Sequence, residues 1–315
     1  MVQGNHSLGI LCAVIGVVAM SVMDVVIKWL SPVYPLHEIV LVRTVIALFL
    51  TLIMVHFEGG LGLLKTKRPG LHIIRGSMIA VANMTFYLAL AIMPIADAAA
   101  LFYVAPLLIT ALSVPLLGER VGMRRWFAIL IGFGGVILMS GVGTSTFKSA
   151  AALPLIAALA YALTQLMTRK LGDTEKASVM AFYIGVVFLI VSIGFGLTVG
   201  DGSLVGAGGP GLEFLLRAWH WPDSEAIILM VVCGALVAVV AYMLTQAYRI
   251  SEANLIAPFE YIVLPMAIVW GYLLWDEIPT FKTIIGIILI GGSGIYVFVH
   301  ERITRKNGSQ MGGNV

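Results

Sequence analysis

The chain has 315 residues, of which 60% are hydrophobic and only 11% are charged, and its formal net charge is +3. This composition excludes an ordinary soluble globular domain. The small net charge gives no reason to expect nucleic acid as a partner.

Ten apolar segments follow one another along the chain, each close to the ~20 residues that cross a membrane as a helix. Continuous apolar runs predict helices, because barrel strands would alternate apolar and polar residues. We therefore expect an all-α polytopic membrane protein. Its ten transmembrane helices are predicted at 8–30, 36–57, 71–92, 95–117, 124–141, 149–168, 177–199, 224–249, 252–275 and 280–300.

The ten segments form two similar halves of five. Residues 84–139 align without a gap with residues 242–297, at a constant offset of 158, so that Tyr103 matches Tyr261 and Glu119 matches Glu277. An odd number of crossings per half inverts the second half relative to the first. We predict two inverted five-helix repeats, at 1–145 and 146–306, followed by a disordered cytoplasmic tail at 307–315.

Lysine and arginine are distributed unevenly between the two predicted membrane faces. With a cytoplasmic N-terminus, 14 of them lie on the cytoplasmic side and 4 on the other. Because positive residues are retained in the cytoplasm, this asymmetry predicts that both termini are cytoplasmic.

Four ionisable residues interrupt the first three spans, and such groups are costly in a membrane. Asp24 and Lys28 are four residues apart on one helix face. Either they form a local ion pair, or Lys28 reaches the interface and Asp24 binds a proton or a substrate cation. Arg43 lies about 10 Å into its span. It either pairs with Asp24, Glu38 or a helix C-terminus or binds an anionic substrate group. We interpret Arg75 as an anchor that reaches the interface.

The ninth span carries an acidic residue beside a proline. Glu260 lies about 12 Å into this span, two residues after Pro258, and Pro265 follows; the matched fourth span contains Pro106. Proline removes a backbone donor and opposes a regular helix. Paired broken helices at matching positions indicate a binding site at the membrane midplane. We expect Glu260 to contact a substrate cation or a proton, and a hydrogen bond between helices is the alternative.

Polar side chains recur at helical spacing on three further spans. They line a cavity or form hydrogen bonds between helices. The positions are Asn83 and Tyr87 in the third span, Tyr161, Thr164, Gln165 and Thr168 in the sixth, and Tyr242, Thr245, Gln246 and Arg249 in the eighth.

Other features of the halves indicate structural roles. Glu119 and Glu277 close the fourth and ninth spans, where we expect them to cap helices and tether neighbours. The glycines of the fifth and tenth spans predict close packing, as a scaffold or a homodimer face. Segment 200–222 is Gly-rich and carries Trp219 and Trp221; it is an interfacial anchor or a lid over an outer vestibule.

The sequence gives no sign of a cofactor. It lacks a glycine-rich phosphate loop, and its six histidines lack metal-ligand spacing, so we expect neither direct use of ATP nor a bound metal.

These residues resemble the EamA-type ten-helix members of the drug/metabolite transporter superfamily. The resemblance rests on the five-plus-five repeat, on Gly118-Glu119 and Asp276-Glu277 after the fourth and ninth spans, and on the Gly-rich spans that follow. A narrower resemblance, to a bacterial sub-branch with proposed S-adenosylmethionine and riboflavin carriers, rests on Asp24 to Lys28, His37-Glu38 with Arg43, Arg68-Pro69 with His72 and Arg75-Gly76, and Pro258 to Tyr261.

The resemblance implies a central cavity between spans 1–4 and 6–9, with spans 5 and 10 outside it, in a bacterial inner membrane. It places these substrate-binding candidates on or near the pathway: Asp24, Asn83, Tyr87, Tyr103, Gln165, Gln246, Glu260 and Tyr261. Structural or gating roles fall to Lys28, Arg43, Pro106, Glu119, Pro258, Pro265 and Glu277. Asp276 departs from the repeat, because it replaces glycine before the acidic residue.

We therefore expect a secondary transporter that moves a small polar metabolite, similar to an amino acid, S-adenosylmethionine or riboflavin, by alternating access. The alternatives are a membrane-embedded enzyme acting on a lipid-linked substrate and a structural membrane protein that transports nothing. The expected partners are the substrate and the lipid bilayer.

Overall fold

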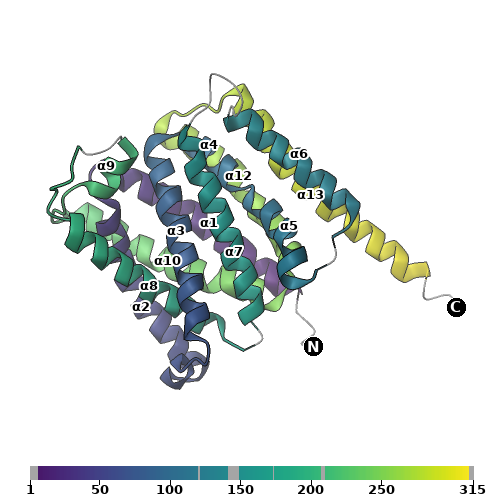
Figure 1. The fold of residues 1–315 in the computed structure, drawn as a ribbon, viewed down its shortest axis with the longest axis horizontal. Helices are drawn as coiled ribbons and strands as arrows, with labels where there is room; N and C mark the ends of the chain where they lie inside the picture. The colour runs from purple at the N-terminus through teal and green to yellow at the C-terminus, as the bar shows by residue number, and fades with distance from the viewer. Residues whose placement is uncertain (1–5, 120, 141–148, 173, 207–209, 312–315) are drawn as a thin grey trace.

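The computed structural model describes residues 6–119, 121–140, 149–172, 174–206 and 210–311, and these form helices without any strand (Figure 1). The all-α prediction is confirmed. The long helices are α1 (His6–Leu30), α2 (Leu36–Gly59), α3 (Pro69–Ile92), α6 (Met123–Ser140), α7 (Ala152–Leu171), α8 (Ala177–Val199), α10 (Ser224–Ile250) and α13 (Phe281–Met311). The short ones are α4 (Ile95–Phe102), α5 (Ala105–Leu117), α9 (Pro210–Leu216), α11 (Ala253–Ile256) and α12 (Val263–Trp275), with 3-10 turns η1 (Leu61–Leu64), η2 (Ser149–Ala151) and η3 (Ala257–Ile262).

Within these ranges, nine helical segments are long and apolar enough to cross a membrane. One of them, Ile95–Leu117, combines α4 and α5, and another, Ala257–Trp275, combines η3 and α12. The apolar part of α13, Phe281–Tyr296, is shorter. The chain is therefore a multi-pass membrane protein. Helix α13 continues beyond the predicted boundary at 306, and residues 312–315 of the predicted tail lie outside the described residues.

The fourth and ninth spans are both broken, and prolines lie in the first turn of the helical segments that follow the breaks. Pro106 lies in the first turn of α5, after the backbone leaves the helix at Tyr103. Pro258 lies in the first turn of η3, and Pro265 in the first turn of α12. The first turn of a helix has no use for these backbone N–H groups, so proline fits there.

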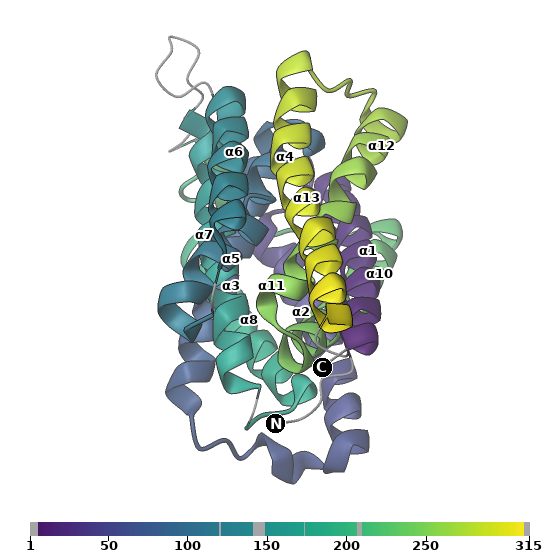
Figure 2. The ribbon, with the colours of Figure 1, turned by 90° about the vertical axis from the view of Figure 1, so that its right-hand side faces the viewer.

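The helices pack in pairs that join the two halves of the chain. Helix α1 lies against α10, α3 against α7, α2 against α8 and α6 against α13. Helices α6 and α13 run side by side along the right-hand edge in Figure 1, and both lie on the face turned toward the viewer in Figure 2. Glycine permits the close contacts: a Cβ on Gly76 of α3 would lie 2.5 Å from Val187 of α8, and one on Gly135 of α6 would lie 3.1 Å from the carbonyl oxygen of Gly286 of α13.

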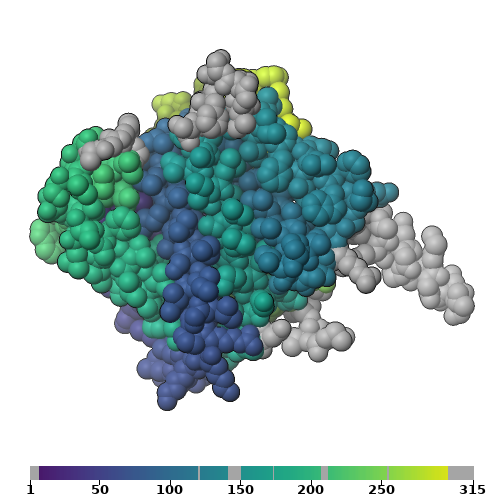
Figure 3. Space-filling model, viewed as in Figure 1, coloured from purple at the N-terminus to yellow at the C-terminus, as the bar shows by residue number. Residues whose placement is uncertain are grey.

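The two ends of the molecule are built differently. The connection between α2 and α3, including η1, projects at one end (Figures 1 and 3). At the other end α9 packs on α3 and α2. Phe214 of α9 is buried, and the Arg217 guanidinium donates to the Ser31 carbonyl (3.0 Å). Of the two tryptophans in segment 200–222, Trp221 is 90% exposed, while Trp219 is half-buried. The segment therefore covers the ends of α1 and α2.

Candidate functional site

A cavity of about 110 Å³ lies between α1, α2, α3, α7, α8 and α10. Its walls are mainly apolar and include the rings of Phe86, Phe102 and Phe188. Its polar lining consists of Asp24, Arg43, Thr44, Thr51, Arg75, Asn83, Tyr161, Thr164, Gln165 and Thr245. Five helices contribute these polar side chains, so the cavity is a meeting point of both halves of the chain.

Asp24 enters this cavity from α1, and the charge of Arg43 on α2 acts on it without direct contact. Its side chain is 5% exposed, and no described residue forms a hydrogen bond or ion pair with its carboxylate. The predicted local pair with Lys28 does not form, because Lys28 Nζ donates to Glu277 Oε1 at 2.6 Å and to the Met93 carbonyl at 3.4 Å. The carboxylate is therefore left facing the cavity.

Arg43 of α2 faces the same cavity and is 2% exposed. It donates to the Tyr87 hydroxyl (3.0 Å), its guanidinium carbon lies 4.9 Å from the Tyr87 ring centre, and its Nε has no partner. A cation over an aromatic face is stabilised electrostatically. Among the described residues, no carboxylate lies within 4.0 Å of Arg43, so the predicted ion pair with Asp24 or Glu38 is not formed.

Arg75 is a cavity residue that the sequence interpretation missed. It is 1% exposed, so its interpretation as an interface anchor is wrong. Its guanidinium donates to the Thr168 hydroxyl of α7 (2.7 Å), the Met180 carbonyl of α8 (3.0 Å) and the Thr245 hydroxyl of α10 (3.0 Å). Arg75 therefore joins four helices through neutral acceptors. The sequence did contain one indication of this role. The polar stripes of the sixth and eighth spans include Thr168 and Thr245, the two hydroxyls that accept from Arg75.

Glu260 lies beside the cavity but does not line it. The carboxyl is 0% exposed, and its Oε1 accepts hydrogen bonds from Tyr161 (2.9 Å) and Tyr248 (2.5 Å). Its Oε2 is buried without a partner. Tyr161 does line the cavity, so its ring lies between the cavity and Glu260.

The other substrate-binding candidates divide into two groups. Asn83 and Gln165 line the cavity with Asp24. Tyr87, Tyr103, Gln246 and Tyr261 do not line it: Tyr87 supports Arg43, Gln246 accepts from Arg249 (3.4 Å), and the hydroxyls of Tyr103 and Tyr261 are buried without partners. Pro106, Pro258 and Tyr261 line a separate space of about 30 Å³.

Glu277 holds one end of the molecule together. Besides Lys28, it accepts from the backbone N–H of Ile95 (3.0 Å), the first residue of α4. A carboxylate at a helix N-terminus satisfies an open donor and interacts favourably with the helix dipole. Glu119, its counterpart in the repeat, lies beyond α5 and has a buried Oε2 without a partner. Burial raises the pKa of this carboxyl, and the charge of Arg169 opposes the shift.

The sequence interpretation did not single out two acidic residues, of which one lies in the last turn of α2 and the other in the connection between α7 and α8. Glu58 accepts from the hydroxyls of Ser178 (2.6 Å) and Tyr242 (2.7 Å). Glu175 accepts from Thr66 (2.6 Å). These contacts tie the end that carries η1 to α8 and α10. In the described part of the chain, no group of three or more His, Cys, Asp or Glu could hold a metal ion.

Comparison with known proteins places this geometry among transporters. Residues 7–141 match the EamA-like transporter family. The chain is 25% identical to an S-adenosylmethionine uptake transporter of Rickettsia prowazekii, covering 96% of this chain and 97% of that protein. It is 27% identical to a riboflavin transporter of Rhizobium johnstonii, covering 93% and 91%. It is also 27% identical to a pseudopaline exporter of Pseudomonas aeruginosa, covering 90% and 93%.

A solved crystal structure has the same fold, with a TM-score of 0.70 at 16% identity, over 93% of this chain and 98% of that one. That structure shows the shared fold alone, whereas the resemblance indicated by the sequence is confirmed by the family match and the named relatives. Because the family and these relatives are transporters, the membrane-embedded enzyme is set aside.

Proposed function

We propose, from the premise that residues 7–141 belong to the EamA-like transporter family, that this chain is a secondary transporter. It moves a small polar metabolite across the bacterial inner membrane by alternating access. A relative named for uptake and one named for export are about equally similar to this chain, at 25% and 27% identity, so the relatives leave the direction open.

The observation that carries the proposal is a pair of opposite charges that face one cavity without forming a direct ion pair. Asp24 and Arg43 both line the cavity, the charge of Arg43 acts on the Asp24 carboxyl, and among the described residues neither has an oppositely charged group within 4.0 Å. Buried charges that lack direct contact with an opposite charge are only partly compensated. A ligand that carries both an ammonium or sulfonium group and a carboxylate would complete both contacts.

This reasoning favours an amino-acid-like or S-adenosylmethionine-like substrate over a riboflavin-like one, because a flavin carries no such pair of charges at neutral pH. The apolar part of the ligand would lie against Met20, Phe86 and Phe188, which line the same cavity.

The size of the cavity supports a mechanism with moving helices. About 110 Å³ is the room of a few water molecules, at ~30 Å³ each. Sites for small ligands usually have roughly 300–1,000 Å³. A metabolite therefore requires the surrounding helices to separate, as they do when a carrier opens to one side.

The pattern of helix packing supports the two inverted five-helix repeats. If α1, α2, α3, α4–α5 and α6 correspond to α7, α8, α10, α11–α12 and α13, two of the main contacts have counterparts: α1 with α10 matches α3 with α7, and α2 with α10 matches α3 with α8. The tenth crossing would be the apolar part of α13, and the lysine and arginine distribution supports cytoplasmic termini.

A homodimer would use the outer faces of α6 and α13. Gly132, Gly135 and Gly286 are already covered within the chain, whereas a Cβ on Gly134 would meet nothing within 4 Å. Leu130 and Phe127 are exposed on the same helix. A tryptophan at Gly134 would block this dimer without touching the substrate cavity, and the mass of the detergent-solubilised protein reports the result.

The test of the function is stabilisation of the purified protein by a metabolite panel, followed by uptake into proteoliposomes. A true ligand raises the unfolding temperature with concentration, as RT ln(1 + [L]/Kd). We expect amino acids or S-adenosylmethionine to stabilise the wild type, and Asp24→Asn and Arg43→Gln each to lose the effect. Glu213→Gln, at an exposed position on α9, is the matched control.

Stabilisation by riboflavin that survives both cavity substitutions would contradict the assignment of a doubly charged substrate. Absence of ligand binding and of transport for every compound in the panel would favour the alternative of a structural membrane protein.

A further inference from the structure

We propose that Glu260, Tyr161 and Tyr248 form a second site, which takes up and releases a proton, and that Tyr161 links this site to the substrate cavity. The inference rests on the proposed transport function for its biological meaning. The site itself is assigned from contacts that do not depend on the substrate.

The contacts of Glu260 suit both an ionised and a protonated carboxyl. When it is ionised, the hydroxyls of Tyr161 and Tyr248 both donate to Oε1, at 2.9 and 2.5 Å. Its Oε2 is fully buried and has no partner, so a proton has an unoccupied oxygen to bind. Hydrogen bonds to an ionised acceptor are stronger than neutral ones. The two donors are nevertheless neutral, and the charge of the carboxylate is not cancelled by them.

No positively charged side chain contacts Glu260 directly. In the described part of the chain, no lysine, arginine or histidine lies within 4.0 Å of its carboxylate, and Arg125 of α6 lines the small space beside Pro258 and Tyr261 instead. The 3-10 turn η3 packs on α1, α5, α11, α12 and α13. The charged side chains of α1 are Asp24, which faces the cavity, and Lys28, which is bound to Glu277.

The remaining titratable neighbours are tyrosines. The hydroxyls of Tyr103, at the end of α4, and of Tyr261, in η3, are buried without partners. A proton is therefore the counter-charge that this environment lacks, because an isolated carboxylate at this depth is strongly unfavourable.

The site lies where the regular helix of the ninth span is interrupted. Glu260 belongs to η3, the 3-10 turn inside the ninth span, and Pro258 in its first turn has no N–H to donate. Broken helices at the midplane are where secondary transporters bind their coupling ions. Rotation of α12 relative to α11 would move Glu260 with respect to Tyr161 and Tyr248, and so change access to Oε2.

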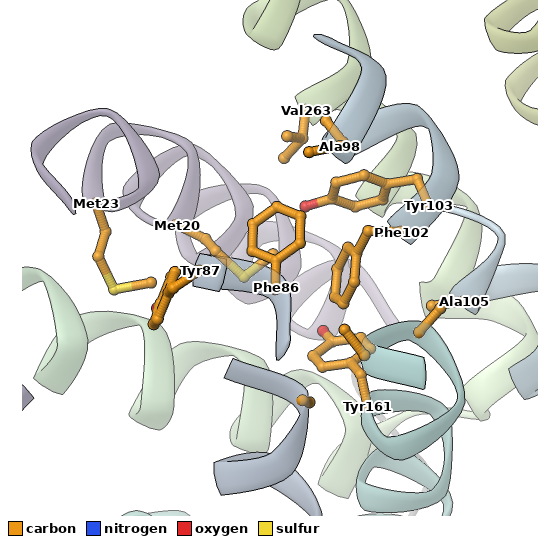
Figure 4. Packing of buried hydrophobic residues seen from close by; sticks show 14 of the residues in the cluster. Met20, Met23, Phe86, Tyr87, Ala98, Phe102, Tyr103, Ala105, Tyr161 and Val263 are labelled. Carbon is orange, nitrogen blue, oxygen red and sulfur yellow. The ribbon is translucent and has the colours of Figure 1, made fainter. Parts of the chain in front are cut away.

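Tyr161 connects the proton to the substrate. Its ring lines the cavity, and its hydroxyl donates to Glu260. Phe102 also lines the cavity, and its ring centre lies 5.3 Å from that of Tyr161 and 5.2 Å from that of Tyr103; Figure 4 shows Phe102 between the two. A ligand that displaces the Tyr161 ring alters the hydrogen bond to Glu260. By reciprocity, protonation then alters ligand affinity by the same factor.

The proton is detected without knowing the substrate. Infrared spectra of the purified protein are recorded as a function of pH, and the C=O stretch of the protonated carboxyl is followed. We expect a titrating band that is lost in Glu260→Gln and kept in Asp24→Asn and in Glu213→Gln. An unchanged titration in Glu260→Gln, with the protein monodisperse, overturns the proposal.

Two further comparisons make the assignment specific. Tyr161→Phe should keep the band and displace its midpoint, whereas Tyr183→Phe, whose hydroxyl binds the Leu64 carbonyl instead, should not. Replacing K⁺ by Na⁺ in the buffer should leave the midpoint in place; a displacement by Na⁺ would reassign the site to that ion.

The coupling is tested with S-adenosylmethionine as the added probe. If it binds, it should displace the midpoint in the wild type and not in Tyr161→Phe; an equal displacement in both rejects the link through Tyr161. A titrating Glu260 in a protein that binds and transports nothing would reject the proposed function and keep the proton site. Transport by a protein in which Glu260 does not titrate would keep the proposed function and reject the proton site.

Discussion

Gly118 and Asp276 end α5 and α12 in the same left-handed backbone conformation, with φ/ψ of 70°/19° and 52°/27°. The next residue in each case turns its N–H back to a helix carbonyl: Glu119 to Ser113 (3.2 Å) and Glu277 to Gly271 (3.0 Å). All three positions match at the offset of 158 residues. The replacement of glycine by aspartate therefore changes the side chain but keeps the turn that positions each glutamate.

Because Gly118 is left-handed, we predict that a side chain at this position reduces the stability of the fold. A Cβ there would meet nothing within 4 Å, so the cost comes from the left-handed backbone alone. We expect Gly118→Ala to reduce the free energy of unfolding by about 1–2 kcal/mol. Thermal unfolding in detergent measures it. Gly134→Ala, inside α6 and also open, should be neutral or stabilising because alanine favours a helix. Equal effects of the two substitutions would show that the backbone of Gly118 is not strained by alanine.

The ion pair between Lys28 and Glu277 predicts strong coupling between these residues. Their side chains are 9% and 22% exposed, so removing one partner leaves the other charge poorly solvated. We expect Lys28→Met or Glu277→Gln alone to cost about 3–5 kcal/mol, and the double substitution to cost less than the sum. The free energy of unfolding of the wild type, the two single variants and the double variant gives the coupling energy in a double-mutant cycle. Additive effects would mean that the pair contributes nothing beyond its two members.

Glu119 predicts a dependence of stability on pH. Burial and the nearby charge of Glu252 raise the pKa of this carboxyl, against the opposing charge of Arg169. Between the ordinary pKa of glutamate and the raised one, the folded chain holds the proton that the unfolded chain has lost, so the stability it contributes is present at low pH and lost as the pH rises.

We therefore expect Glu119→Gln to be more stable than the wild type at neutral pH, with the advantage shrinking as the pH falls into the range of an ordinary glutamate. Unfolding temperatures from about pH 4 to about pH 8 give the comparison. Glu213→Gln, on the exposed face of α9, should follow the wild type. An advantage of Glu119→Gln that grows as the pH falls would reverse the sign argued here.

The course of the helices is largely readable in the sequence, because lipid requires long apolar runs. The second span was predicted at 36–57 and is helical over Leu36–Gly59. The break in the fourth span was expected at Pro106, and the helix ends at Phe102, because proline starts the next helix and the chain turns before it. Helix α9 within segment 200–222 was not foreseen, since glycine and tryptophan there indicate a loop.

The candidate site is less readable, because helical spacing identifies a polar face but not the neighbour it meets. Asp24 and Gln165 face the cavity, whereas Glu260 lies behind Tyr161, since a broken helix has no fixed rotation that spacing could reveal. The short distance between Arg75 and the start of its span predicts an anchor at the membrane interface. Its burial depends on α7, α8 and α10 closing around it, and no local pattern in α3 contains that information.

Gly234 of α10 allows α2 to pack closely against α10 at the position of Arg43. A Cβ there would lie 2.7 Å from the Arg43 carbonyl oxygen and 2.7 Å from the Ile46 Cβ. Neither is the end of a flexible side chain, so α10 and α2 must separate to admit it. We expect Gly234→Ala to cost about 1–3 kcal/mol of unfolding free energy.

Gly234→Ala should also displace Arg43 and weaken ligand stabilisation. Gly194→Ala, on the open face of α8, should change neither quantity, and thermal unfolding with and without ligand measures both. If Gly234→Ala lost stability but kept full ligand stabilisation, the position of Arg43 would not limit binding. If Gly234→Ala loses both stability and ligand stabilisation while Gly194→Ala keeps both, the close contact between α2 and α10 is what positions the Arg43 charge for binding.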